Sequence, residues 1–270
     1  MSINFRLELS FKDIEDLDRK IQFCINNNIY NLNIPCKGKI KKEFLKHVID
    51  YIGLNFKKMD VTYHYSCKHQ FSRTLCNSFS ELSEFISKCI KYNTDVLLIS
   101  GANKKKDFDS IKVLNYLNDG KKSKINYGIA YNPYFEEYIF IEEERKRLFE
   151  KLNTGIVSSI WLQFGSDINL LEKELIFLKQ VIKTYSKNNN SEISLYGSLF
   201  IPTKQFLARF KFRPWKSVFL SKDYLSSLDY SYGITKNIID IYSKNNIFPL
   251  VESQCSSTKE LNKIYQILTK

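Results

Sequence analysis

The chain has 270 residues, with 41 Lys and Arg against 29 Asp and Glu, so its formal net charge is +12. Hydrophobic residues make up 43% and charged residues 26%, which is the composition of a globular protein and excludes a disordered tail, a disulfide-rich miniprotein and a coiled coil. No apolar run reaches the roughly 20 residues that are needed to cross a bilayer, which excludes a membrane-spanning protein.

Short β-rich runs alternate with longer amphipathic segments along the whole sequence. The expected strands are 5–10, 30–34, 60–67, 94–101, 125–132, 158–165, 193–201 and 247–253. The helices expected after them, in the same order, are 14–27, 41–54, 79–92, 109–118, 141–153, 168–187, 230–244 and 258–268. Eight β-then-α units without a linker rich in Pro, Gly or Ser predict an α/β fold, a single (β/α)8 TIM barrel that forms one domain over residues 1–270. An open, doubly wound sheet is the second interpretation, but no GxGxxG motif follows the first strand.

Three element boundaries carry physical signals. Ser78, with Glu81 three residues later, has the pattern of a capping box at the start of a helix. Asp167 precedes an apolar-periodic segment and is expected to be its N-cap, and Gly155 is expected to end the helix before it.

The basic excess has two interpretations. Basic patches attract polyanions, so a nucleic acid or a phosphorylated ligand is one of them. Lys far outnumbers Arg, however, and is scattered along the chain together with Asn and Ile. The densest run, Lys104-Lys105-Lys106, is followed at once by Asp107 and Asp109. We therefore favour a solvated surface and expect neither nucleic acid nor a membrane as a partner.

The compartment follows from the N-terminus and the cysteines. The first residues lack the basic and apolar regions of a signal peptide. The six cysteines include no CxxC pair and have no framework spacing, which indicates reduced thiols. We expect a cytoplasmic protein.

In such a barrel the active site forms at the C-terminal ends of the strands, so the polar residues there are the candidates. Glu8 lies between apolar neighbours in the first strand; it is either an inward general acid or a Glu in solvent. His64 and His69 flank Cys67 at the end of the third strand, but His64 and Cys67 face opposite ways along an extended chain. A histidine that hydrogen-bonds a ligand is therefore favoured over a metal site.

Other strand ends combine small, aromatic and amide side chains. Gly101 allows the close approach of a ligand, and Ala130 and Tyr131 place a small residue beside an aromatic one. Gln163 is an amide inside an apolar strand, which needs a hydrogen-bonding partner. With 14% aromatic residues, the mouth of the barrel would suit a flat heteroaromatic ligand such as a flavin or a pterin.

Taken in order, these strand ends resemble the methylenetetrahydrofolate reductase family. The segments that carry the resemblance are 64–68, 97–101, 128–133, 151–155 leading to Gln163, and 197–202. It spans roughly residues 5 to 252, and its motifs are short, so their order and spacing make the case.

The resemblance implies a flavoenzyme that binds FAD and reduces 5,10-methylenetetrahydrofolate to 5-methyltetrahydrofolate with hydride from NAD(P)H. It implies one-carbon metabolism and methionine biosynthesis as the setting, NAD(P)H and a reduced folate as partners, and leaves a homo-oligomer open. Glu8 would be the catalytic acid. The residues that would contact the cofactor are His64, Gly101, Ala102, Ala130, Tyr131 and Lys151. Gln163 would bind the pterin, and Phe206 the nicotinamide or the folate.

The sequence departs from the pattern of that family at several positions, and one of them bears on the folate chemistry. Ala102 stands where many members have an acidic residue after a glycine. The alternative is therefore a divergent member that has lost flavin or folate chemistry and acts as a ligand-binding or complex-forming subunit.

Overall fold

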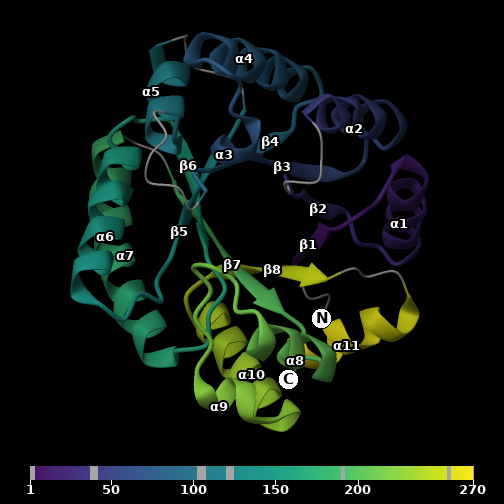
Figure 1. The fold of residues 1–270 in the computed structure, drawn as a ribbon, viewed down its shortest axis with the longest axis vertical. Helices are drawn as coiled ribbons and strands as arrows, with labels where there is room; N and C mark the ends of the chain where they lie inside the picture. Colours follow the sequence, from purple (N-terminus) through teal and green to yellow (C-terminus); the bar gives the residue numbers. More distant parts are fainter. Residues whose placement is uncertain are drawn as a thin grey trace. The chain divides into compact units, whose positions relative to one another are not determined.

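The computed structural model describes residues 4–36, 42–101, 108–119, 125–189, 192–253 and 257–269. Eight strands form a closed barrel in the order of the sequence, each strand next to the one that follows it (Figure 1). They are β1 (Arg6–Leu9), β2 (Asn31–Ile34), β3 (Asp60–Ser66), β4 (Asp95–Ile99), β5 (Tyr127–Tyr131), β6 (Val157–Leu162), β7 (Ser194–Phe200) and β8 (Ile247–Ser253). The predicted (β/α)8 barrel is confirmed, and the open, doubly wound sheet is wrong.

Helices follow the strands along the whole chain. They are α1 (Ile14–Asn26), α2 (Lys42–Asn55), α3 (Cys67–Gln70), α4 (Leu75–Lys91), α5 (Ser110–Asp119), α6 (Tyr138–Leu152), α7 (Ile168–Asn189), α8 (Lys204–Phe212), α9 (Lys222–Ser226), α10 (Leu228–Lys244) and α11 (Thr258–Leu268). Of the helices that the structure describes, none is long and apolar enough to cross a membrane.

Contacts group the chain into two compact units. The first unit comprises Met1–Glu8, Tyr131–Lys146 and Ile160–Lys270. The second unit comprises Leu9–Ala130 and Arg147–Ser159. The expectation of one domain over the whole chain stays a prediction, and each unit is described by itself below.

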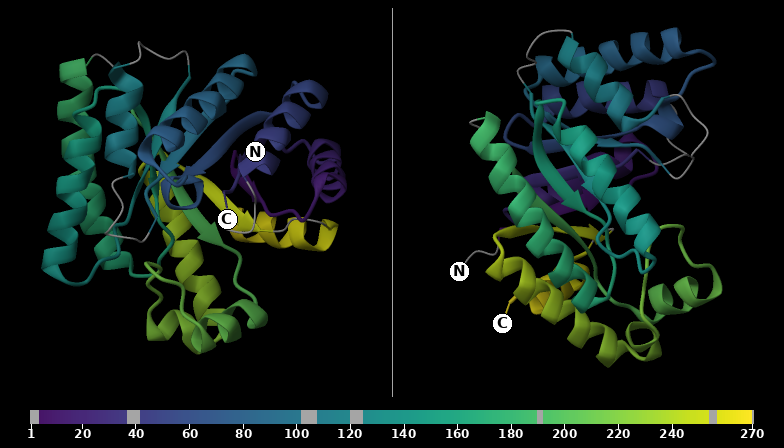
Figure 2. Two further views of the ribbon diagram at one scale, coloured as in Figure 1. Left: turned by 45° about the horizontal axis from the view of Figure 1, so that its top comes forward. Right: turned by 90° about the vertical axis from the view of Figure 1, so that its left-hand side faces the viewer.

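In the second unit, the faces of the strands are set by the parallel register of β2, β3 and β4. Tyr65 of β3 packs on Phe85 of α4, with ring centroids 5.0 Å apart, so this side of β3 faces the helices. Side chains alternate along a strand, so Thr62, His64 and Ser66 point to the opposite, inner face. Figure 2 shows α2 and α4 lying outside these strands.

In the first unit, β7 and β8 pair in parallel over six residues, from Leu195↔Ile247 to Phe200↔Glu252. A Cβ atom on Gly197 would lie 2.2 Å from Cζ of Tyr242 in α10, so only glycine allows this helix to pack so closely. Gly197 therefore faces the helices, and Ser198 faces the inner side of the strand.

Two of the three predicted boundaries are confirmed. Asp167 accepts a hydrogen bond from the backbone N–H of Leu170 at 2.9 Å, and Gly155 has a positive φ of 77° just after α6. The capping box at Ser78 is wrong, because α4 begins at Leu75 and Thr74 caps it. Ser78 lies buried one turn inside, where its hydroxyl donates to the carbonyl of Thr74. The short helices α3, α8 and α9 were not predicted.

A buried ion pair joins α6 and α7 in the first unit. Glu174 of α7 is 0% exposed and accepts hydrogen bonds from Arg145 at 2.6 and 3.1 Å. The hydroxyl of Tyr131, at the end of β5, donates to the same carboxylate at 2.5 Å. The hydrogen bond to Glu174 raises the pKa of Arg145, so the guanidinium stays charged.

We expect Arg145→Met to lower the free energy of unfolding by about 3–5 kcal/mol, because it leaves the carboxylate of Glu174 buried without its cation. Denaturant unfolding of purified protein measures this loss. Lys146→Met, which removes an exposed cation from the next position of α6, should change stability by less than about 0.5 kcal/mol. A double variant, Arg145→Met with Glu174→Met, should recover most of the loss. Equal destabilisation by Arg145→Met and by the control Lys146→Met would contradict this account.

Candidate functional site

The inner faces of β2 and β3, in the second unit, are polar where a barrel is usually filled by branched apolar side chains. Asn33 of β2 and His64 of β3 are 0% and 6% exposed, and Thr62 and Ser66 beside them are also buried. Nδ2 of Asn33 lies 2.9 Å from Nε2 of His64, which is a hydrogen bond across neighbouring strands. Buried polar groups cost free energy unless they are paired, so this pairing explains how the strands tolerate them.

The hydrogen bond from Asn33 selects one tautomer of the neutral His64 ring. An amide nitrogen can only donate, so Nε2 accepts, and the ring proton of the neutral imidazole lies on Nδ1. His64 is thus held as a neutral ring whose Nδ1–H is a donor. Such a donor can polarise a carbonyl oxygen of a ligand.

Two thiols lie at the ends of β2 and β3. Nε2 of Gln70 donates to Sγ of Cys36 at 3.0 Å, and Cys67 begins α3 directly after Ser66. Burial raises the pKa of Cys67 to about 12 and also raises the pKa of Cys36. Both thiols are therefore protonated near neutral pH and poorly suited to act as nucleophiles. The described part of the chain contains no group of three or more metal-binding side chains.

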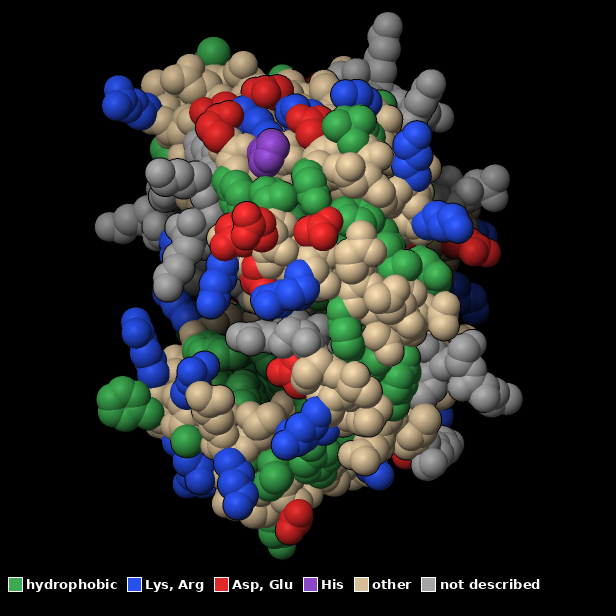
Figure 3. Space-filling model, turned by 90° about the vertical axis from the view of Figure 1, so that its right-hand side faces the viewer, with side chains coloured by type: hydrophobic (Ala, Val, Ile, Leu, Met, Phe, Trp, Pro, Cys, Tyr) green, Lys and Arg blue, Asp and Glu red, His purple; other side chains and the backbone are tan. Residues whose placement is uncertain are grey.

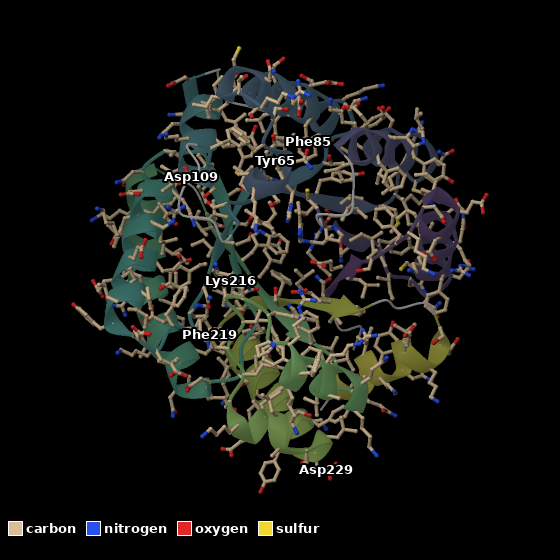
Figure 4. All side chains as sticks on the ribbon, in the orientation of Figure 1. Tyr65, Phe85, Asp109, Lys216, Phe219 and Asp229 are labelled. Atoms are coloured by element: carbon tan, nitrogen blue, oxygen red, sulfur yellow. The ribbon has the colours of Figure 1, made fainter. Side chains whose placement is uncertain are left out.

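A charged cluster lies beside these strand ends. Nη2 of Arg147 donates to Oγ of Ser100 at 3.1 Å and lies 3.2 Å from the carboxylate of Asp109, which is labelled in Figure 4. One turn further along α6, Nζ of Lys151 donates to the carbonyl of Ala130 at 2.9 Å. Asp109 and Lys151 both act on the pKa of Cys67, in opposite directions, so the end of β3 belongs to the same neighbourhood.

Gly101 is needed for a neighbouring side chain. Its φ is +79°, and a Cβ atom there would lie 2.7 Å from Cβ of Lys68. The sequence suggested that Gly101 lets a ligand approach the backbone closely. In the structure the side chain of Lys68 makes this approach. Ala102, the next predicted residue, lies outside the described residues.

The remaining predicted residues belong to the first unit. Glu8 is buried in β1, next to Arg6, whose guanidinium lies 5.8 Å from the ring centroid of Tyr196. The hydroxyl of Tyr131 is bound to Glu174, and burial raises its pKa. Gln163 uses its side-chain oxygen to accept the backbone N–H of Phe164, its neighbour in the chain.

Phe206 belongs to an aromatic cluster. Its ring stacks on Phe200, the last residue of β7, with centroids 5.3 Å apart and planes at 5°. Trp215 contacts both rings at their edges. Phe206 therefore fills the space between α8 and the end of β7.

Of the predicted residues, the structure brings four into the second unit and four into the first. His64, Gly101, Ala130 and Lys151 belong to the second, and Glu8, Tyr131, Gln163 and Phe206 to the first. Sequence reasoning missed Asn33 and Arg147. A signal for Asn33 was available: Asn31 and Asn33 alternate with Leu32 and Ile34 in a strand, which indicates one polar and one apolar face.

Comparisons with known proteins place the chain by its fold. No protein-family model matches it, and no curated protein sequence matches it. Among solved structures it is similar to an aldo-keto reductase of the silkworm Bombyx mori, with a TM-score of 0.50 and 10% identity over 98% of this chain and 79% of that one. An aldose reductase of Schistosoma japonicum matches with a TM-score of 0.49 and 10% identity over 98% and 83% of the two chains. At this identity the likeness concerns the barrel fold.

The expected membership in the methylenetetrahydrofolate reductase family is wrong. No family model or curated sequence supports it, and the silkworm protein, matched over almost the whole chain, belongs to a different family of barrels. FAD, the reduced folate and the role in one-carbon metabolism are not supported, nor is a divergent member of that family. Three of the segments behind the resemblance, 97–101, 128–133 and 197–202, consist largely of glycines, prolines and short apolar runs, which any (β/α)8 barrel needs at its strand ends.

The pairing of Asn33 with His64 predicts a measurable tautomer. In ¹⁵N-histidine-labelled protein at neutral pH, we expect the ring of His64 to show a protonated Nδ1 and an unprotonated Nε2, because Asn33 donates to Nε2. The chain has three histidines, so the His64→Gln variant assigns the signal. Asn33→Leu should return the ring to a mixture of tautomers; a protonated Nε2 in the unmodified protein would contradict the arrangement.

Proposed function

We propose that the chain is an oxidoreductase that uses NAD(P)H to reduce the carbonyl group of a small substrate. The observation that carries the proposal is the buried His64, held as a neutral donor by Asn33 on the inner face of β2 and β3. Carbonyl reduction needs such a donor, because negative charge develops on the oxygen as hydride reaches the carbon. The name of the silkworm protein, a reductase of aldehydes and ketones with the same fold, is consistent with this choice.

The residues of the second unit suit a nucleotide cofactor. Arg147 and Lys151 supply two cations one helical turn apart, and Arg147 uses only part of its donor capacity on Ser100 and Asp109. These two residues would hold the phosphate groups, and the hydroxyl of Ser66 offers a neutral donor and acceptor for a ring carboxamide. When bound, the reduced nicotinamide supplies the hydride.

His64 would act on the substrate oxygen. Its Nδ1–H donates to the carbonyl oxygen, which makes the carbon more electrophilic and stabilises the alkoxide that forms. Asn33 keeps the ring oriented and prevents Nε2 from carrying the proton, so the donor always points the same way. The proton that completes the alcohol comes from solvent, and His64 leaves the reaction unchanged.

We expect His64→Gln to lower kcat for carbonyl reduction by roughly 10²-fold or more, because the flexible amide does not hold a donor where the ring Nδ1–H lies. The loss of NADH or NADPH absorbance, with a panel of aliphatic and aromatic aldehydes and ketones, measures the rate. His47→Gln is the matched control, because His47 is an exposed histidine of α2 in the same unit.

Two results would contradict the proposal. One is the absence of NADH and NADPH oxidation with every carbonyl tested. The other is an equal rate for the unmodified protein and His64→Gln, which would leave the reaction without its proposed donor.

A further inference from the structure

Half of the net charge of the chain is concentrated in one short stretch, residues 203–222, which we call the basic segment. Between Glu192 and Asp223 the sequence has no acidic residue. The basic segment supplies six cations, and the whole chain has an excess of twelve. Its cations are Lys204, Arg209, Lys211, Arg213, Lys216 and Lys222.

These side chains reach solvent. All six are exposed, and they come from α8, from the start of α9 and from the loop between them. Lys204, Arg209, Lys211 and Arg213 form no ion pair with any residue that the structure describes. Figure 3 shows Lys and Arg side chains around hydrophobic ones at the lower left, the side on which α8 and α9 lie. The segment therefore presents its cations to solvent.

Aromatic rings lie among these cations. Phe212, at the end of α8, is 91% exposed, and Trp215 is 41% exposed. Trp215 is held by the rings of Phe200 and Phe210, with centroids 5.1 and 5.9 Å away, so its position is fixed. Most of the Phe212 ring lies in solvent, so packing in the core does not account for it, and a function in binding is one explanation to consider. Base stacking is such a function, because every nucleobase has a face that packs on such a ring.

A lipid surface fits the segment less well. Membrane-bound helices insert a broad apolar face, and α8 has only nine residues. Its apolar residues Leu207 and Phe210 are buried, and Leu207 packs in one cluster with Phe164 and Tyr224. The part of α8 that faces solvent is cationic apart from Phe212 and small or amide side chains, so little apolar surface remains to insert.

We propose that the basic segment binds single-stranded nucleic acid. Its Lys and Arg side chains neutralise successive phosphates, and unpaired bases stack on Phe212 and Trp215. A duplex hides the faces of its bases, so it can use only the cations. The sequence alone favoured a solvated surface because lysines are scattered along the chain; the structure gathers these cations with exposed rings on one side of the first unit.

Fluorescence anisotropy with labelled 20-nucleotide oligo(dT) and oligo(U) tests the proposal on the full chain. We expect both oligonucleotides to bind more tightly than a duplex of the same length. The oligonucleotide with the higher affinity shows whether single-stranded DNA or RNA is the preferred ligand. Affinity should fall steeply with salt, and replacing Arg209, Lys211 and Arg213 by Gln should reduce the slope of log K against log salt by about 2. Phe212→Ala should weaken binding by roughly tenfold with unchanged folding, because the ring touches little of the core.

The matched control removes three exposed lysines of α7 in the same unit, through Lys173→Gln, Lys179→Gln and Lys183→Gln. It makes the same change in net charge and should leave the salt slope within about 0.5 of the unmodified value. Equal weakening by both triple variants would show attraction by net charge alone and overturn the proposal. Three other results would also overturn it: no binding of either oligonucleotide, equal or tighter binding of phosphatidylserine vesicles, and full displacement of the oligonucleotide by saturating NADPH.

Discussion

The two faces of each parallel strand are the constraint from which the rest of this structure follows. One face must be apolar because helices cover it, as Tyr65 on Phe85 and Gly197 under Tyr242 illustrate. The other face is free to carry polar groups as long as they pair with one another. Asn33 and His64 use that freedom, and the bond between them turns two costly buried groups into one oriented donor. The stability of the barrel and its proposed chemistry thus depend on the same alternation.

That alternation also explains how far the sequence could be interpreted. The order of strands and helices was predictable, because a strand buried on both faces and an amphipathic helix have different periods. Asp167 and Gly155 were predictable because their roles depend on local backbone geometry. Ser78 and Glu81 matched a local pattern too, but Thr74, four residues earlier, is also a good N-cap, and its hydroxyl accepts a hydrogen bond from the backbone N–H of Asn77.

The candidate site was harder to predict because it depends on which side chains meet across strands. Neighbours in the chain such as Ala130 and Tyr131 were both expected near a cofactor, yet successive residues of a strand point to opposite faces. The hydroxyl of Tyr131 accordingly reaches Glu174 in the helix layer. Conversely, Arg147 and Ser100 lie 47 positions apart and meet only because α6 packs beside the end of β4. Strand register and helix packing determine such contacts, and neither can be predicted from a single motif.

The charged residues show a second feature that depends on packing and could not be predicted from the sequence. In the second unit some cations are matched: Lys88 pairs with Asp50 at 2.5 Å, and Lys46 pairs with Glu84. Such pairs cancel the local electrostatic field, so the paired lysines do not indicate an anionic binding partner. The cations of α8 have no such matches among the described residues, and they surround exposed rings. Part of the net charge of +12 therefore rests on cations such as those of α8, whose field is not cancelled by a paired carboxylate and extends into solvent, where it can attract a polyanion.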